Sequence, residues 1–154
     1  MIGADIRPAR AGDEAEIARL AGELGYPSTA EEIAARLLAL ARERSFVAVA
    51  AGPTGNGGLQ GWVAAEQRVT LDAGERAELT GLVVGAGARG TGVGRALVEA
   101  AERWALGRGI ALMTVRSNVL RPESHPFYAR LGYALTKTQH CYRKHLPRSA
   151  AERS

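Results

Sequence analysis

The chain has 154 residues, of which 46% are hydrophobic and 23% charged, and its net charge at pH 7 is +4. The single cysteine, Cys141, excludes an internal disulfide, and no apolar run approaches the ~20 residues of a membrane span. The first ten residues lack the apolar segment of a secretory signal. We therefore expect a cytoplasmic protein without a membrane partner, with one domain over residues 1–146 and a flexible tail over residues 147–154.

The positive charge invites a nucleic-acid interpretation, which the distribution of the arginines disfavours. They are spread singly along the chain, often beside glutamate, as in residues 41–45 and 100–104. Only 5% of the residues are aromatic, and no basic block is interleaved with them. We expect a solvated, arginine-rich surface and no nucleic-acid partner. A modest positive field would still attract a small polyanionic cofactor.

The chain begins with a predicted strand at residues 4–10, followed by two helices. Asp13 precedes Glu16 by three residues, the spacing of a capping box, and Thr29 precedes Glu32 in the same way. Apolar residues at helical period follow both boxes: Ile17, Leu20, Ala21 and Leu24 after the first, and Ile33, Leu37, Leu40 and Ala41 after the second.

Three strands are then predicted in succession, at residues 45–51, 59–69 and 77–84, with glycine-rich turns between them. The next helix begins at Val93 and has one apolar stripe, formed by Val93, Ala96, Leu97, Ala100, Ala101, Trp104 and Ala105.

Beyond this helix the sequence predicts a strand at residues 110–118 and a short helix with Pro126 in its first turn and Gly132 after its end. Residues 133–146 alternate in polarity, which favours two final strands. Consecutive hairpin strands pair antiparallel, whereas the strand–helix–strand order around the long helix requires a parallel step. We expect an α+β fold with a mixed, largely antiparallel central sheet flanked by helices.

Residues 82–97, LVVGAGARGTGVGRAL, contain two overlapping glycine motifs. Residues 85–90 fit G-x-G-x-x-G, the dinucleotide fingerprint, and residues 89–94 fit R-x-x-G-x-G, a loop for another pyrophosphate. A Rossmann half places its loop after the first strand, whereas several hairpin-connected strands precede this one. The residues after Gly94 are also too few for a second nucleotide half and a substrate domain.

About twenty positions past the glycines, where an NAD site places an acidic residue, the chain has Arg116 and Ser117. An arginine there can bind the 2′-phosphate of NADP, so an NADP-dependent oxidoreductase stays an alternative. A Walker loop is excluded, because Thr91 stands where that motif has lysine. The R-x-x-G-x-G interpretation is favoured, since its glycines let backbone N–H groups approach a pyrophosphate at a helix N-terminus and Arg89 adds a cation.

Three segments together resemble one family. ELTGLVVGAGARGTGVGRALVEAAERWALGRG, LMTVRSN and SHPFYARLGY are similar, in order and spacing, to the GNAT superfamily of acyl-CoA-dependent N-acetyltransferases. The resemblance covers roughly residues 45–145. It implies acetyl-CoA as co-substrate, no metal, and direct attack of an acceptor amine in a ternary complex. It also implies a sheet in which the strand before the loop diverges from its parallel neighbour, with pantetheine in the gap.

The resemblance also assigns residues to coenzyme A. The strand before the loop would bind pantetheine through its backbone, and an N–H near Val83 or Val84 would polarise the thioester carbonyl. The loop would bind the pyrophosphate, and Asn118 would contact pantetheine, although an asparagine stabilising its own turn is an alternative. The residues assigned in this way are Leu82, Val83, Val84, Arg89, Gly90, Thr91, Gly92, Val93, Gly94, Arg95 and Asn118.

Two residues are candidates for proton transfer. Tyr128 matches the family tyrosine that protonates the leaving thiolate, and the alternative is a packing tyrosine on a short helix. Glu78 is the candidate base, because several family members carry a glutamate there, but a solvated glutamate or a water chain stays open. Strand alternation would put Glu78, Thr80 and Leu82 on one face.

The acceptor is the least determined part. Tyr26, Trp62, Glu66 and His140 are candidate wall residues, and the acidic groups around the third strand would suit a cationic amine of a small molecule or a peptide. No metal-ligand spacing occurs. A non-catalytic acyl-CoA-binding module is an alternative, and a homodimer is compatible with the fold that the resemblance implies.

Overall fold

The structure is a computed structural model that describes residues 5–52, 58–116 and 124–147. The chain forms two compact units, Met1–Ser117 and Asn118–Ser154. In the described part of the chain, no helix is both long and apolar enough to cross a membrane.

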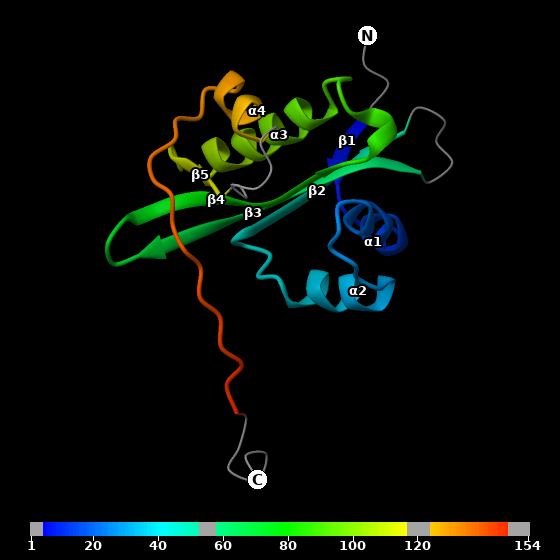
Figure 1. The fold of residues 1–154 in the computed structure, drawn as a ribbon, viewed down its shortest axis with the longest axis horizontal. Helices are drawn as coiled ribbons and strands as arrows, with labels where there is room; N and C mark the ends of the chain where they lie inside the picture. The colour runs from blue at the N-terminus through cyan, green and yellow to red at the C-terminus, as the bar shows by residue number, and fades with distance from the viewer. Residues whose placement is uncertain (1–4, 53–57, 117–123, 148–154) are drawn as a thin grey trace. The chain divides into compact units, whose positions relative to one another are not determined.

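The first unit is built on a five-stranded sheet in the order β1-β2-β3-β4-β5 (Figure 1). The first three pairings are antiparallel and β4 pairs with β5 in parallel. This arrangement confirms the expected α+β class with a mixed sheet. The strand bounds are β1 (Asp5–Pro8), β2 (Ser45–Ala51), β3 (Leu59–Thr70), β4 (Gly74–Val84) and β5 (Met113–Val115).

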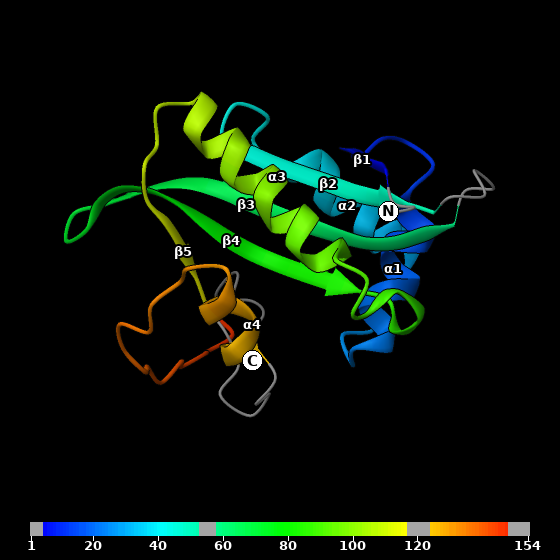
Figure 2. The same cartoon turned by 90° about the horizontal axis from the view of Figure 1, so that it is seen from above.

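Helices cover both faces of this sheet. In Figures 1 and 2, α1 (Glu14–Glu23) and α2 (Ala30–Ala39) lie on one face and α3 (Val93–Gly107) on the other. Under α1 and α2 the core contains Leu20, Ile33, Val49 and Val83, with Trp62 packed against it. The apolar stripe of α3 is confirmed, because its members are buried or half-buried.

One of the two expected capping boxes forms. Thr29 Oγ1 accepts the N–H of Glu32, whose carboxylate accepts the N–H of Thr29. The box expected at Asp13 is wrong: its carboxylate accepts two hydrogen bonds from Arg7, both 2.9 Å, and one from the N–H of Arg10. A charged guanidinium is a stronger partner than a backbone amide. The α2 helix also ends at Ala39, before the Leu40 and Ala41 of its predicted face.

A β-bulge in β4 changes which side chains share a face. Ala64 pairs with Gly81 and Ala65 with Leu79, so Thr80 is an extra residue. Glu78 lies opposite Glu66, whereas Leu82 lies opposite Val63, three residues away along β3. Three residues along a regular strand reverse the face, so Glu78 and Leu82 point to opposite sides of the sheet. The prediction that they share a face is wrong.

The second unit contains α4 (Ser124–Arg130), which has Pro126 in its first turn. Gly132 follows the helix with φ of 94°, as its predicted place after the end requires. The two final strands are not present: residues 134–147 are all exposed and none of them is in a strand. Alternating polarity marks a segment that suits a sheet, but a strand also needs a backbone partner. The strand predicted at residues 110–118 is likewise shorter in the described residues, at Met113–Val115.

Candidate active site

The parallel pairing of β4 ends early. It joins Ala77–Leu79 to Met113–Val115, and within the described residues no strand pairs with this edge of β4 between Thr80 and Val84. The antiparallel pairing with β3 on the other edge continues to Val84. Among the described residues, the last five of β4 therefore form an edge that a further extended segment can pair with.

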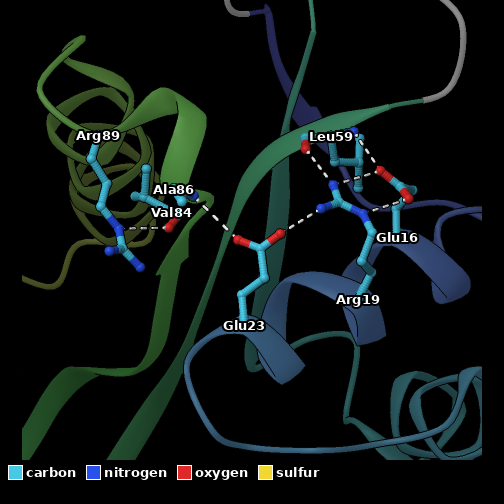
Figure 3. Close-up of polar contacts among 7 residues, drawn as sticks. All are labelled: Glu16, Arg19, Glu23, Leu59, Val84, Ala86 and Arg89. Carbon is cyan, nitrogen blue, oxygen red and sulfur yellow. Dashed lines mark hydrogen bonds and ion pairs between the residues drawn. The ribbon is translucent and has the colours of Figure 1, made fainter.

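The direction of the backbone groups on this edge follows from one hydrogen bond. Gly85 N–H donates to Gln60 O at 2.8 Å, just past the pair formed by Gly61 and Val84. Because hydrogen-bonded pairs alternate along an antiparallel ladder, Val83 directs its N–H and C=O to β3. Leu82 and Val84 then direct theirs to the open edge. Arg89 Nε lies 3.4 Å from the carbonyl oxygen of Val84, consistent with this direction (Figure 3).

The chain turns from β4 into α3 through a 3-10 turn, η1 (Ala86–Ala88), and a glycine-rich stretch. Gly90 and Gly92 have φ of 79° and 92°, which side chains other than glycine rarely adopt. Gly92 is the N-cap of α3 and offers no side chain to its first N–H groups. The first bond of the helix is from Ala96 N–H to Gly92 O, so the N–H groups from Gly92 to Arg95 have no partner within the helix.

The electrostatics of this helix N-terminus favour an anion. The first turn of α3 contains no acidic residue, and Arg89 and Arg95 are both exposed beside it. Arg95 also pairs with Glu99 one turn later, with Nε and Oε2 at 3.2 Å. The N–H groups without a helical partner, the positive end of the helix dipole and two guanidinium groups together suit a phosphate or pyrophosphate.

Glu78 lies in a charged cluster on the face of the sheet opposite α3. It is 7% exposed, and its carboxylate lies 3.3 Å from Arg68 Nη1 and 3.9 Å from Arg76 Nη2. Glu66 lies directly opposite Glu78 and 3.7 Å from Arg68 Nε. The arginines offset the repulsion that two facing carboxylates would otherwise have. The cluster places carboxylates and guanidinium groups on one patch of the face that contains Trp62.

The remaining acceptor candidates are less closely grouped. Trp62 is half-buried, pairs with Val83 and shares its face with Glu66. Tyr26 follows α1 and is 53% exposed. His140 lies in the exposed segment of the second unit, and Asn118 lies outside the described residues. In the described part of the chain, no three His, Cys, Asp or Glu side chains are grouped as metal ligands would be.

Tyr128 is half-buried in the second unit and packs edge-to-face with Phe127 and Tyr133, at centroid distances of 5.0 and 5.8 Å. Burial raises the pKa of its phenol above the ordinary value. The hydroxyl therefore carries its proton at neutral pH, as a proton donor requires.

Sequence reasoning missed several charged residues near these groups. Arg68 and Arg76 pair with Glu78, and the signal was present in the mirrored E-x-R and R-x-E patterns of two hairpin strands. Arg19 and Glu23 on α1, together with Gln60, line a pocket of about 600 Å³ formed with residues 85–89. The E-x-x-R-x-x-x-E spacing on α1 indicates ion pairs on one helix face, but not what that face contacts.

The sequence of the chain matches a known protein family. Residues 13–133 match the sequence profile of the acetyltransferase (GNAT) family. The chain belongs to the GNAT acetyltransferase family. No protein with a curated description matches it in sequence.

Solved structures of GNAT acetyltransferases share the fold. An aminoglycoside 6′-N-acetyltransferase from Acinetobacter haemolyticus is 20% identical, with 92% of this chain and 99% of that chain covered and a TM-score of 0.77. Glucosamine-6-phosphate N-acetyltransferase from Arabidopsis thaliana is 20% identical, with 91% and 97% covered and a TM-score of 0.77. Aminoglycoside N-acetyltransferase AAC(6′)-Iy, solved in complex with CoA, is 22% identical, with 93% and 95% covered and a TM-score of 0.79.

Proposed function

We propose that this GNAT protein moves the acetyl group of acetyl-CoA to a primary amine of a small molecule or a peptide. The observation that carries the proposal is the junction of β4 and α3. An edge whose backbone groups face outwards leads directly to an uncapped helix N-terminus with two arginines beside it. An extended arm with amide groups that ends in a pyrophosphate matches both parts, and coenzyme A has such an arm.

The residues present fit coenzyme A in two places. Leu82 and Val84 would pair with the amides of pantetheine as a neighbouring strand does, while Val83 keeps its pairing with β3. The N–H groups from Gly92 to Arg95 would bind the pyrophosphate, with Arg89 and Arg95 supplying charge. Asn118 stays a candidate contact for pantetheine.

Acetyl-CoA would supply the acetyl group, and the chain's own groups would stabilise charge and move protons. A backbone N–H on the open edge, from Val84 or Leu82, would stabilise the negative charge that develops on the carbonyl oxygen. Glu78 would accept the proton of the attacking amine, directly or through water, and Tyr128 would donate one to the leaving thiolate. We assign both units to one domain over residues 1–146, because the family match runs across their boundary.

The acceptor class rests on the face that contains Trp62, Glu66 and Glu78. Carboxylates on this face would attract a cationic amine, although Arg68 and Arg76 offset part of their charge. The similar structures include an aminoglycoside and a glucosamine-6-phosphate N-acetyltransferase. This favours a small-molecule amine over a peptide.

The proposal is tested by thiol release from acetyl-CoA against a panel of polyamines, aminoglycosides, amino sugars and peptides. We expect release that depends on one class of amine, and calorimetry that shows binding of CoA but not of NADPH. Binding of CoA with no release for any amine would indicate a non-catalytic acyl-CoA-binding module. Binding of NADPH without binding of CoA would overturn the proposal.

A further inference from the structure

Helix α1 presents three charged side chains in a row to the first residue of β3 and to the turn after β4 (Figure 3). Arg19 lies between two glutamates, with Nε 2.8 Å from Glu16 Oε2 and Nη1 2.7 Å from Glu23 Oε2. These ion pairs lie one helical turn apart on a partly exposed helix face, where such pairs contribute little to stability by themselves.

Both ends of this row bond to backbone groups far along the chain. Glu16 Oε1 accepts the N–H of Leu59 at 3.0 Å, and Arg19 Nη2 donates to the carbonyl of Leu59 at 3.1 Å. Glu23 Oε1 accepts the N–H of Ala86 at 3.2 Å. One carboxylate oxygen of Glu23 thus binds Arg19 while the other holds the turn that leads from β4 into α3.

This turn is anchored at both ends, where Gly85 N–H donates to Gln60 O at 2.8 Å, Ala88 N–H donates to Gly85 O at 2.9 Å and Ala88 is buried, whereas its middle has fewer contacts. Ala86 and Gly87 are exposed, and nothing lies within 4 Å of the position that a Cβ would occupy at Gly87. A single 3-10 turn has low stability unless residues from other elements contact it. The conformation of this turn determines where Arg89 and the N–H groups at the start of α3 lie.

We propose that Glu23 is a positioning residue: its carboxylate, held by Arg19, fixes Ala86 and thereby orients the anion-binding turn and Arg89 for the pyrophosphate of coenzyme A. The inference rests on the proposed function. Glu23 itself touches no phosphate, since an acidic group there would repel one. Arg19 offsets that charge and leaves one carboxylate oxygen to accept the hydrogen bond from Ala86.

The test compares Glu23→Ala with Glu23→Gln, which keeps an oxygen acceptor for Ala86, and with Glu31→Ala on the exposed side of α2 as a control of equal charge change. Dissociation constants for CoA come from calorimetry, and KM is measured separately for acetyl-CoA and for the amine. Exchange of the Ala86 amide hydrogen is followed by NMR in the free protein, which needs no ligand.

We expect Glu23→Ala to bind CoA about tenfold more weakly, the size of one lost charge-assisted hydrogen bond. Its KM for acetyl-CoA rises, its KM for the amine is unchanged, and its Ala86 amide exchanges faster. Glu23→Gln restores CoA binding to within about threefold, and Glu31→Ala equals the wild type.

Three outcomes would overturn the inference. They are equal CoA binding by Glu23→Ala and the wild type, an unchanged exchange rate at Ala86, and tighter binding by Glu23→Ala. The last would show that the carboxylate competes with the ligand for the Ala86 N–H. A wild-type protein that binds no CoA refutes the proposed function instead, and this result is seen before any variant is made.

Discussion

The indole ring of Trp62 packs directly against the backbone of Gly81. A Cβ at position 81 would stand 2.8 Å from Cζ3 and 3.0 Å from Cη2 of the ring. Gly81 follows the bulged Thr80 and pairs with Ala64, so the ring lies over the part of β4 where the strand departs from regular pairing. The absence of a side chain at Gly81 therefore sets where Trp62 lies on the face proposed for the acceptor.

Replacing Gly81 by alanine should displace this ring. We expect Gly81→Ala to lower the free energy of unfolding by about 1–3 kcal/mol, as overpacking does, and to raise KM for the amine more than KM for acetyl-CoA. Urea denaturation and steady-state kinetics measure the two effects. Trp62→Phe, which puts a smaller ring at this position of β3, should relieve part of the loss in the double variant. Additive losses would contradict this account.

Gly90 and Gly87 form a matched pair for the glycine turn. At both positions a Cβ would have no atom within 4 Å, but only Gly90 has a positive φ, of 79°. We expect Gly90→Ala to lose about 1–2 kcal/mol of stability and to weaken CoA binding, because the added Cβ disfavours this backbone conformation. Gly87→Ala should stay within about 0.5 kcal/mol of the wild type in urea denaturation. Equal losses would show that the turn does not depend on its φ angles.

A mutation can separate a catalytic role of Glu78 from a purely structural role in pairing Arg68 and Arg76. We expect Glu78→Gln to lower kcat/KM by about 10²–10⁴-fold, the range for loss of an acid or base, with CoA affinity unchanged. Glu75→Gln is the control, since Glu75 lies on the same strand, is exposed and bonds to Gln67. A large loss of stability with kcat retained would show that Glu78 serves only to pair Arg68 and Arg76.

If Tyr128 is the proton donor, its mutation and a rise in pH should both lower the reaction rate. Tyr128→Phe should lower kcat about 10²–10⁴-fold while CoA still binds. Because burial raises the pKa of this phenol, the donor proton is present at neutral pH and is lost only as pH rises above the ordinary value of about 10. Initial rates up to alkaline pH measure this limb. Tyr142→Phe, at an exposed site of the same unit, should behave as the wild type.

The ion pair of Asp13 and Arg7 predicts a stability that depends on pH. The guanidinium of Arg7 holds the pKa of Asp13 below its ordinary value, so the stabilisation is present above the unfolded value near 3.9 and disappears as pH falls through the lower folded value. We expect Asp13→Asn to cost about 2 kcal/mol at pH 7. The gap to the wild type should close below about pH 4, and a gap independent of pH would contradict the ion pair.

The capping boxes show what sequence spacing can and cannot predict. Thr29 and Glu32 form the expected box because they only need each other and their own backbone. Asp13 has the same spacing, but Arg7 of β1 binds its carboxylate in the folded chain. Sequence spacing shows which hydrogen bonds a side chain can make to nearby backbone groups. The partner that binds the Asp13 carboxylate, Arg7, lies on β1 outside the helix, and the spacing of the box does not include it.

The candidate site likewise combines features that the local sequence predicts with contacts that only the folded chain creates. Periodicity predicted β1–β4 and the stripe of α3, which follow local rules, but it also predicted two final strands at residues 133–146 that do not form. It did not predict the bulge at Thr80, so Glu78 was expected on the face of Leu82. Nor did it predict that Glu23 would meet Ala86, a contact that exists only once α1 packs beside the end of β4.

The bulge at Thr80 divides β4 into two stretches with opposite phase. Before it, even-numbered residues such as Glu78 face away from α3; after it, even-numbered residues such as Leu82 face towards α3. The stretch of β4 before the bulge therefore contributes Glu78 to the charged cluster, and the stretch after the bulge forms the open edge. Deletion of Thr80 would keep all other residues of β4 but would move the side chains of one stretch to the opposite face of the sheet. The number of residues at this point therefore matters as much as their identity.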